Sequence, residues 1–272
     1  MKIHFLGTAA AEGFPNAFCR CEFCKKARAA GGKNIRTRSS AIIDDNIKFD
    51  YSPDSYMQAL RDNVDYSLIE HLLVTHSHMD HLNAPDLESR REGIAHGLDR
   101  PLHIYGNGTV MYHVRKAIGR FEGARFVFHL LRPFETFTAG DARVTPLLAD
   151  HDRMENCHLY ALEKNGKKLL YGHDSGWFPD ATWAWLKDQA FDCAVLDCTH
   201  GYTGKSRDRN HMCIETVLEV QAEFRKHNIL KPDGKIVATH FSHNSRLLHD
   251  EFEEIFRPAG IIPAYDGLIL NI

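Results

Sequence analysis

The stretch His76-Ser77-His78-Met79-Asp80-His81 is the most informative part of this chain. It follows the apolar run Leu72-Leu73-Val74, which predicts a buried strand that ends just before His76. Extended residues two apart point the same way, so His76 and His78 can share one metal ion. Asp80 and His81 come as the chain turns, and they can serve a second cation about 3.5–4 Å from the first. The alternative, a histidine-rich turn without metals, would need four metal-binding side chains to coincide by chance.

The remaining predicted elements indicate a layered α/β protein. Short β-rich runs at 2–6, 41–43, 47–49, 102–105, 125–130, 142–148, 157–163, 168–171, 191–196, 235–239 and 268–272 alternate with helical patterns at 53–62, 85–98, 179–189, 212–227 and 246–256. Two strand-rich halves, each completed by helices, favour two sheets packed face to face with helices outside. Another layered α/β arrangement is equally compatible with this pattern.

Size and charge narrow the class of protein. The chain has 272 residues, is 43% hydrophobic and can bury a large core, so we expect a single domain over residues 1–272. Its formal net charge of -3 provides no general attraction for nucleic acid. The segment 25–38 contains Lys25, Lys26, Arg28, Lys33, Arg36 and Arg38 and no acidic residue. This segment is either a solvated loop or a local patch for an anionic substrate.

The sequence lacks signals for export or membrane insertion. No run approaches the roughly 18 apolar residues of a membrane helix, and the segment Met1–Gly7 has no secretory apolar core. We therefore expect a cytoplasmic protein. In that compartment the seven cysteines are better interpreted as thiols or metal ligands than as a disulfide framework.

Three further candidate ligands follow predicted strands. His151 comes after the strand at 144–148, Asp174 after 169–171 and His240 after 235–239. Any one of them alone could simply satisfy loop backbone groups. Their common position after strands, where α/β folds carry their chemistry, favours a shared site.

This pattern resembles the metallo-β-lactamase superfamily, whose His-x-His-x-Asp-His motif stands here at 76–81. The resemblance covers essentially the whole chain. It implies an αββα sandwich with two metals at one edge between the sheets. It also implies a ligand set: one metal is held by His76, His78 and His151, the other by Asp80, His81 and His240, and Asp174 bridges the two.

Two such cations would supply a nucleophile. They lower the pKa of a shared water from about 15.7 toward about 7 and clamp anionic oxygens. Asp80 and His200 are the predicted catalytic residues, with His200 as the acid that protonates the leaving oxygen. Its alternative role is a loop histidine bonded to backbone. Imidazole and carboxylate ligands suit manganese or zinc, and also iron.

A second metal site is predicted at Cys19-Arg20-Cys21-Glu22-Phe23-Cys24. Three thiols within six residues suit a tetrahedral structural zinc, and His243 is the expected fourth ligand. The alternative is a redox pair of Cys21 and Cys24, but no βαβ context surrounds them.

The cysteine cluster narrows the resemblance to the cyclic phosphodiesterase of the carbon-phosphorus lyase pathway. The matching segments are Gly7-Thr8-Ala9, the cysteine loop, Asp197-Cys198-Thr199-His200, Arg209-Asn210-His211 and Thr239-His240-Phe241-Ser242-His243. This family implies hydrolysis of five-membered cyclic phosphates, including phosphoribosyl 1,2-cyclic phosphate and 2′,3′-cyclic nucleotides, aided by a histidine at the position of His200. Segments 150–156 and 201–206 depart from the family, so the exact ester stays open. His211 is either a contact near the site or buried support.

Other functions share the same core. The segment Gly13-Phe14-Pro15 also resembles the accessory protein of pyrroloquinoline quinone biosynthesis, a non-catalytic relative. A transfer-RNA 3′ nuclease, a lactonase and a thioesterase are further alternatives. We expect a small phosphodiester as the partner, no membrane, and no nucleic acid beyond short or cyclic nucleotides. A homodimer is compatible with the sequence.

Overall fold

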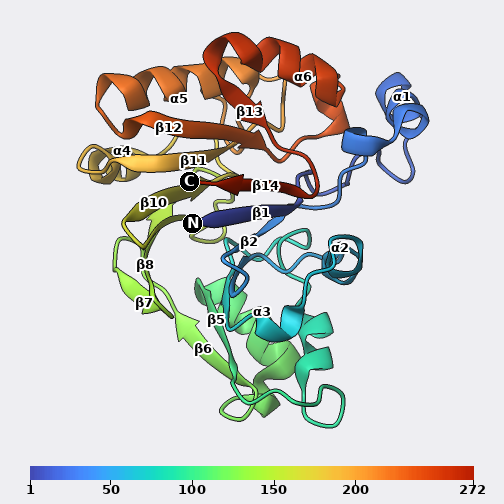
Figure 1. Ribbon diagram of the computed structural model, residues 1–272, viewed down its shortest axis with the longest axis vertical. Helices are drawn as coiled ribbons and strands as arrows, with labels where there is room; N and C mark the ends of the chain where they lie inside the picture. The colour runs from blue at the N-terminus through green and yellow to red at the C-terminus, as the bar shows by residue number, and fades with distance from the viewer.

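The computed structural model describes residues 1–272 and contains two seven-stranded β-sheets packed face to face between layers of helices (Figure 1). The strand order is β14-β1-β2-β3-β4-β5-β6 in the first sheet and β13-β12-β11-β10-β9-β8-β7 in the second. The predicted αββα sandwich is therefore confirmed.

The strands of the first sheet are β1 (Lys2–Gly7), β2 (Ser40–Ile43), β3 (Ile47–Phe49), β4 (His71–Leu73), β5 (Leu102–Gly106), β6 (Phe126–Leu130) and β14 (Leu268–Asn271). Those of the second are β7 (Phe137–Ala139), β8 (Ala142–Leu148), β9 (His158–Lys164), β10 (Lys167–Gly172), β11 (Phe191–Asp197), β12 (Leu230–Thr239) and β13 (Ile261–Pro263). The α-helices are α1 (Glu22–Ala30), α2 (Ser55–Arg61), α3 (Gly108–Ile118), α4 (Asp180–Leu186), α5 (Ile214–Lys226) and α6 (His249–Phe256). Short 3₁₀ helices are η1 (Gly32–Asn34), η2 (Tyr66–Leu68), η3 (Ala84–Arg90), η4 (Gly119–Phe121), η5 (His243–Ser245) and η6 (Arg257–Ala259).

A shared apolar core joins the two sheets. Successive strand side chains point to opposite faces, so alternate residues of each strand enter this layer. Phe49 of β3 stacks on Tyr171 of β10 with ring centroids 4.0 Å apart. Tyr160 of β9 donates its hydroxyl to the backbone oxygen of Val74 at 2.7 Å. These contacts hold the ends of β3, β4 and β10 in fixed relation, and these are the ends from which the site is built.

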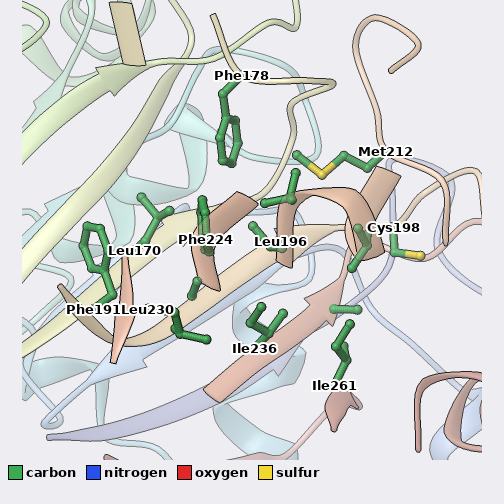
Figure 2. Close-up of a cluster of buried hydrophobic side chains, with 14 of the residues drawn as sticks. Leu170, Phe178, Phe191, Leu196, Cys198, Met212, Phe224, Leu230, Ile236 and Ile261 are labelled. Atoms are coloured by element: carbon green, nitrogen blue, oxygen red, sulfur yellow. The ribbon is translucent and has the colours of Figure 1, made fainter. Parts of the chain in front are cut away.

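The outer faces of the two sheets have separate cores. Helices α4, α5 and α6 cover the second sheet, and Figure 2 shows Phe224 of α5 among Leu170, Leu196 and Ile236 of the strands below. On the first sheet, α3 contributes Val110, Val114 and Ile118 to a cluster with residues of β4 and β5. Burying each such side chain contributes about 1.5–3 kcal/mol relative to leaving it exposed.

Strand direction gathers the loops that carry polar residues. Neighbouring strands from β3 to β6 are parallel, and so are those from β10 to β13. The carboxyl ends of parallel strands meet at one edge of a sheet, where α/β folds bind ligands. Loops after β3, β4, β10, β11 and β12 are therefore close together.

Two parts of the predicted secondary structure are wrong. The helix expected at 85–98 is only the 3₁₀ turn η3, because Gly93 (φ 86°) and Gly97 (φ 72°) take left-handed backbone angles beyond it. Helix α1 occupies part of the segment expected to be a basic loop. Only Cys24 and Ala27 of α1 are buried, at helical spacing, and two apolar positions are too few to predict a helix.

Other elements were not predicted at all. Helix α3 has a signal, since Asn107 caps it by accepting a hydrogen bond from the Val110 amide, and buried apolar residues recur at helical spacing. Strands β7 and β13 have three residues each, too few for an alternating pattern. No helix has the length and apolar character needed to cross a membrane.

The fold predicts a loss of stability in mild acid. His158 on β9 is buried, neither ring nitrogen has a hydrogen-bond partner, and burial lowers its pKa to about 4. The unfolded chain takes up this proton near pH 6.5. Between pH 6.5 and 4 the unfolded state therefore binds more protons, and stability falls as pH falls through that window.

Replacing His158 tests this expectation. His158→Leu should reduce the loss of unfolding free energy between pH 7 and pH 5 by about 2 kcal/mol. The measurement is urea unfolding of both metal-loaded proteins at the two pH values. An unchanged difference between wild type and variant would contradict the assigned protonation behaviour.

Candidate metal centre

The candidate ligands stand at strand ends, several of them in strained backbone. Asp174 follows β10 with φ 60°, and His240 follows β12 with φ 63°. Asp50, directly after β3, has φ 56°. Non-glycine residues in the left-handed region are uncommon and cluster at functional sites. Here the sharp turn after each strand directs the side chain across the edge of the sandwich.

The first cluster contains His76, His78 and His151. Their nearest ring nitrogens all lie within 4.8 Å of one another. Nδ1 of His78 is 2.9 Å from Nε2 of His76 and 3.1 Å from Nε2 of His151. Three converging imidazole nitrogens at these separations are suited to one divalent metal.

The second cluster contains Asp80, His81, Asp174 and His240, all buried. Nε2 of His81 lies 3.0 Å from Oδ2 of Asp80 and 2.6 Å from Oδ2 of Asp174. Nε2 of His240 lies 3.3 Å from Oδ1 of Asp174. His81 Nε2, His240 Nε2 and Asp174 Oδ1 are buried without a hydrogen-bond partner. Such orphaned atoms are costly unless a ligand satisfies them, so the residues fit a metal ion.

Asp174 connects the two clusters. Its Oδ2 is 2.6 Å from His81 Nε2 in the second cluster and 3.5 Å from His76 Nε2 in the first. The structure thus brings together all seven side chains predicted for the two-metal site. It places the carboxylate expected to bridge between the two sets of imidazoles.

In each of the five candidate ligand histidines, one ring nitrogen faces the other ligands and the second nitrogen contacts an oxygen atom. Nδ1 of His81 lies 2.8 Å from Asp50, that of His240 2.8 Å from Thr199 Oγ1, and that of His151 3.1 Å from the Asn210 carbonyl. In the first cluster, Nδ1 of His76 contacts Thr75 and Nε2 of His78 contacts Asp152. Oxygen partners of this kind fix the ring orientation of metal-ligating histidines.

The electrostatics of the site favour positive charge. Burial alone would raise the pKa of Asp80 and Asp174, but the surrounding imidazoles, among them His81 and His240, hold both well below the usual range. Burial would lower the pKa of His81, yet Asp80, Asp174 and Asp50 raise it well above its usual value. The two buried carboxylates are therefore stabilised by nearby positive charge. A proton on His81 supplies only part of that charge.

His211 was left open by sequence reasoning and belongs to this neighbourhood. Its Nδ1 is 2.9 Å from Oδ2 of Asp197 and 3.3 Å from Oδ1 of Asp174. Its ring stacks on His240 with centroids 5.3 Å apart. Although burial would lower it, the carboxylates, Asp197 foremost, raise the pKa of His211 to about 9. The only sequence signal was its place in Arg209-Asn210-His211.

His200, the predicted acid, packs against His211 on the side away from the ligand clusters. Its centroid is 5.5 Å from that of His211, at an interplanar angle of 86°. Burial, together with His211, lowers the pKa of His200. His200 therefore contacts the metal-ligand clusters through His211 in this arrangement.

His173 directly precedes Asp174 in the chain. It is buried, and its ring stacks on both His81 and His240 at centroid separations of 5.6 Å. Burial lowers its pKa to about 4. It packs beneath two candidate ligands as a neutral ring.

A polar cavity of about 380 Å³ opens at the first cluster. Its lining residues are His78, His151, Asp152, Arg153, Arg209 and Asn210. Arg153 is exposed, and Arg209 pairs with Asp150 through Nε at 2.9 Å. The guanidinium of Arg153, which has no ion-pair partner, lies beside the first ligand cluster and favours an anionic ligand.

The cysteine cluster lies between the amino-terminal loop and the loop after β12. Cys19, Cys21, Cys24 and His243 form one group of potential ligands, with Nδ1 of His243 3.7 Å from the Sγ atoms of Cys19 and Cys21. Burial would raise the pKa of Cys21, but hydrogen bonds, from the Cys24 amide and His243 among others, lower it to about 6. A thiolate so favoured is suited to zinc.

Gly201 allows the turn that carries His243 of the cysteine cluster to lie close to the loop that carries His200. It has φ 51°, and a Cβ there would lie 2.4 Å from the Cβ of Ser245 in η5. Only glycine lets the loop carrying His200 pack against the turn carrying His243.

The basic segment 25–38 is largely neutralised by the fold. Lys26 pairs with Glu22, Lys33 with Glu253 and Arg38 with Asp54. Arg36 is buried, where it bonds Thr8, Ala264 and His249. The segment therefore does not form the open cationic patch that the sequence left as one alternative.

A family model described as the beta-lactamase superfamily domain matches residues 45–241. The chain belongs to this superfamily. The match spans the motif at 76–81 and reaches just past His240, so the predicted membership is confirmed.

The chain is similar to proteins that carry different functional descriptions. Coenzyme PQQ synthesis protein B of Klebsiella pneumoniae (strain 342) is 28% identical, over 100% of this chain and 98% of the relative. A solved diphosphatase from the PhnP family has a TM-score of 0.77 at 24% identity, covering 100% of this chain and 97% of that one. Human tRNase Z, short form, has a TM-score of 0.70 at 19% identity, covering 100% and 99%. At these identities the solved structures establish the fold alone.

The cysteine cluster generates a prediction of its own. Cys21→Ser should remove one zinc equivalent per chain and lower the thermal midpoint, because the metal would join two loops distant in sequence. The measurement is elemental analysis with thermal unfolding. Cys157→Ala, a buried thiol outside the cluster, is the matched control. Equal zinc content in both variants would contradict a zinc site at these cysteines.

Proposed function

We propose that this protein is a dinuclear-metal-dependent phosphodiesterase that hydrolyses small phosphate diesters, cyclic ones foremost. Phosphoribosyl 1,2-cyclic phosphate and 2′,3′-cyclic nucleotides are the representative substrates. The observation that carries the proposal is the position of Asp174, whose Oδ2 lies 2.6 Å from His81 and 3.5 Å from His76. One carboxylate within reach of two imidazole clusters is what a pair of bridged cations requires.

The proposed ligand set follows this geometry. His76, His78 and His151 would hold one cation, Asp80, His81 and His240 the other, and Asp174 both. Manganese or zinc, or iron, fits these donors. When bound, such a pair supplies a hydroxide at neutral pH and stabilises the charge of anionic oxygens. A structural zinc at Cys19, Cys21, Cys24 and His243 would complete the metal content.

The chain's own groups support an anionic substrate of modest size. Arg153 and Arg209 line the cavity next to His78 and His151. A guanidinium can bind two phosphate oxygens at once, so Arg153 would orient a diester in front of the cations, while Arg209 stays paired with Asp150. The cavity volume of about 380 Å³ suits a small molecule.

A long RNA substrate is less well supported. Binding along a nucleic acid requires many cationic side chains, each neutralising a phosphate. In the segment 25–38, three cations are in ion pairs and Arg36 is buried. The similarity to tRNase Z therefore supports the fold and its core rather than this substrate.

Similarity to the PhnP-family diphosphatase agrees with phosphate chemistry. Hydrolysis of either a diphosphate or a cyclic diester needs attack on phosphorus and a clamp for anionic oxygens. The choice between the two substrate classes belongs to the loop at 150–156, whose His151, Asp152 and Arg153 line the cavity, and to the loop at 201–206.

A second candidate function has its own observation. The 28% identity to coenzyme PQQ synthesis protein B extends over the whole chain, which favours an accessory role in quinone cofactor synthesis. The presence of all seven side chains in convergent clusters favours catalysis instead. Metal content separates the two, since about three metals per chain support the enzyme and a cysteine-bound zinc alone supports the accessory protein.

The decisive experiment is a substrate panel with the metal-loaded protein. It compares phosphoribosyl 1,2-cyclic phosphate, 2′,3′-cyclic nucleotides, a dinucleoside diphosphate and bis-p-nitrophenyl phosphate with an acyl lactone series. Turnover of phosphate esters without lactones supports the proposal. Turnover of lactones alone, or of none of these with both cations bound, would overturn it.

The first variant to make is Asp80→Ala. It should remove nearly all phosphodiesterase activity while the fold is retained, because a second-site ligand is lost without touching the core between the sheets. The measurement is turnover of bis-p-nitrophenyl phosphate with circular dichroism as the folding control. Activity near that of wild type would defeat the ligand assignment.

A pair of variants tests which histidine protonates the leaving group. His200→Ala should slow turnover by about 100- to 10,000-fold and keep both cations, as expected for loss of a general acid. His211→Ala is the comparison, because His211 lies between His200 and Asp174. If only His211→Ala slows turnover at full metal content, the role of acid passes from His200 to His211.

A further inference from the structure

A second cavity, of about 370 Å³, lies on the outer face of the first sheet. Its walls come from β3 and β4 below and from α2, η2 and η3 above, and none of the candidate metal ligands lines it. The walls are mainly apolar, and they include Ala59, Val64, Ile69, Leu72, Leu87 and Leu102. Its size and character are those of a small-ligand site.

A buried lysine stands at the base of this cavity. Ile47 and Phe49 of β3 point into the core between the sheets, so Lys48 points to the opposite face and is only 1% exposed. Its Nζ donates a hydrogen bond to Ser40 Oγ, its one bonded partner in the protein. An ammonium group has three donors, so two of them lack an acceptor.

No carboxylate forms an ion pair with Lys48, although the charge of Asp50 acts on it from farther away. The nearby Asp50 accepts hydrogen bonds from the amide and hydroxyl of Thr75 and contacts His81, so its oxygens are committed to the metal centre. Burying an ammonium without a carboxylate is costly, because one hydroxyl and two aromatic rings replace only part of its hydration. Burial accordingly lowers the pKa of Lys48 to about 7.

Two further polar groups of the cavity have unsatisfied atoms that can donate. Arg90 lines it, and its Nε is buried without a partner, as is the hydroxyl of Tyr66. The rings of Tyr66 and Tyr51 lie 5.1 Å and 6.0 Å from Lys48 Nζ. No Asp or Glu lines the cavity. The cavity is mainly apolar, and its polar groups without full hydrogen bonding include the cations Lys48 and Arg90 but no carboxylate. Such a cavity is complementary to an anion that carries a hydrocarbon chain.

We propose that this cavity binds a small apolar carboxylate, whose carboxyl group accepts from Lys48 and whose hydrocarbon chain lies along the aliphatic walls. The anion satisfies the free ammonium donors and restores the charged lysine, which a neutral ligand of the same shape cannot do. This site is independent of the proposed phosphodiesterase activity.

Octanoate and 1-octanol are the probes, because they share a chain and differ in charge. The expected result by calorimetry is that the full-length metal-loaded protein binds octanoate more tightly than octanol. Lys48→Met, which keeps the length of the side chain without its charge, should weaken octanoate binding by about tenfold or more and leave octanol within about threefold. Lys116→Met, an exposed lysine outside the cavity, is the matched control.

A second variant keeps the test decisive if Lys48→Met does not fold. Ala95→Phe adds a ring to the cavity wall without changing Lys48, and it should abolish binding of both probes. The proposal is overturned if wild type binds neither probe, if octanoate binds Lys48→Met as tightly as wild type, or if Ala95→Phe binds octanoate unchanged.

Discussion

Buried negative charge at the edge of the sandwich is the constraint on which the site depends. Asp80 and Asp174 are buried among imidazoles, with Nε2 of His81 within 3.0 Å and 2.6 Å of their respective Oδ2 atoms. Such carboxylates are tolerable in a low-dielectric interior only beside cations. The oxygen groups on the far side of each imidazole then fix which nitrogen faces inward. The geometry of the centre is thus built outward from these two carboxylates.

The layered fold brings the groups that satisfy this constraint to one edge of the sandwich. Parallel strands in both sheets bring separate loops to the same edge, and tyrosine and phenylalanine packing between the sheets holds the two edges together. The strain at Asp50, Asp174 and His240, all with positive φ, is sustained by these rigid strands. A free loop would relax into an ordinary conformation and lose the convergence.

On the outer face of the first sheet, a buried charged group has different surroundings from those of the acids at the candidate metal centre. There Lys48 is buried with one hydroxyl partner, whereas two residues later Asp50 is fully committed to Thr75 and His81. Alternation along β3 would place Lys48 and Asp50 on the same face. Asp50, however, lies beyond the end of the strand, and its left-handed backbone (φ 56°) directs its carboxylate toward Thr75 and His81 instead. Strand β3 and the turn that follows it therefore bear on both the candidate metal centre and the proposed carboxylate site.

By itself, the sequence determined the type of chemistry and the architecture. The motif at 76–81, the strand-end residues His151, Asp174 and His240 and the cysteine cluster predicted which side chains come together, because ligand types and strand periodicity are local properties. Local patterns also failed where glycines ended the helix expected at 85–98. Only the tertiary structure brought His211 between His200 and Asp174, paired the basic segment with distant acids and buried Lys48 over an apolar cavity. These outcomes depend on contacts between residues far apart in the chain, and such contacts leave no periodic trace in the sequence.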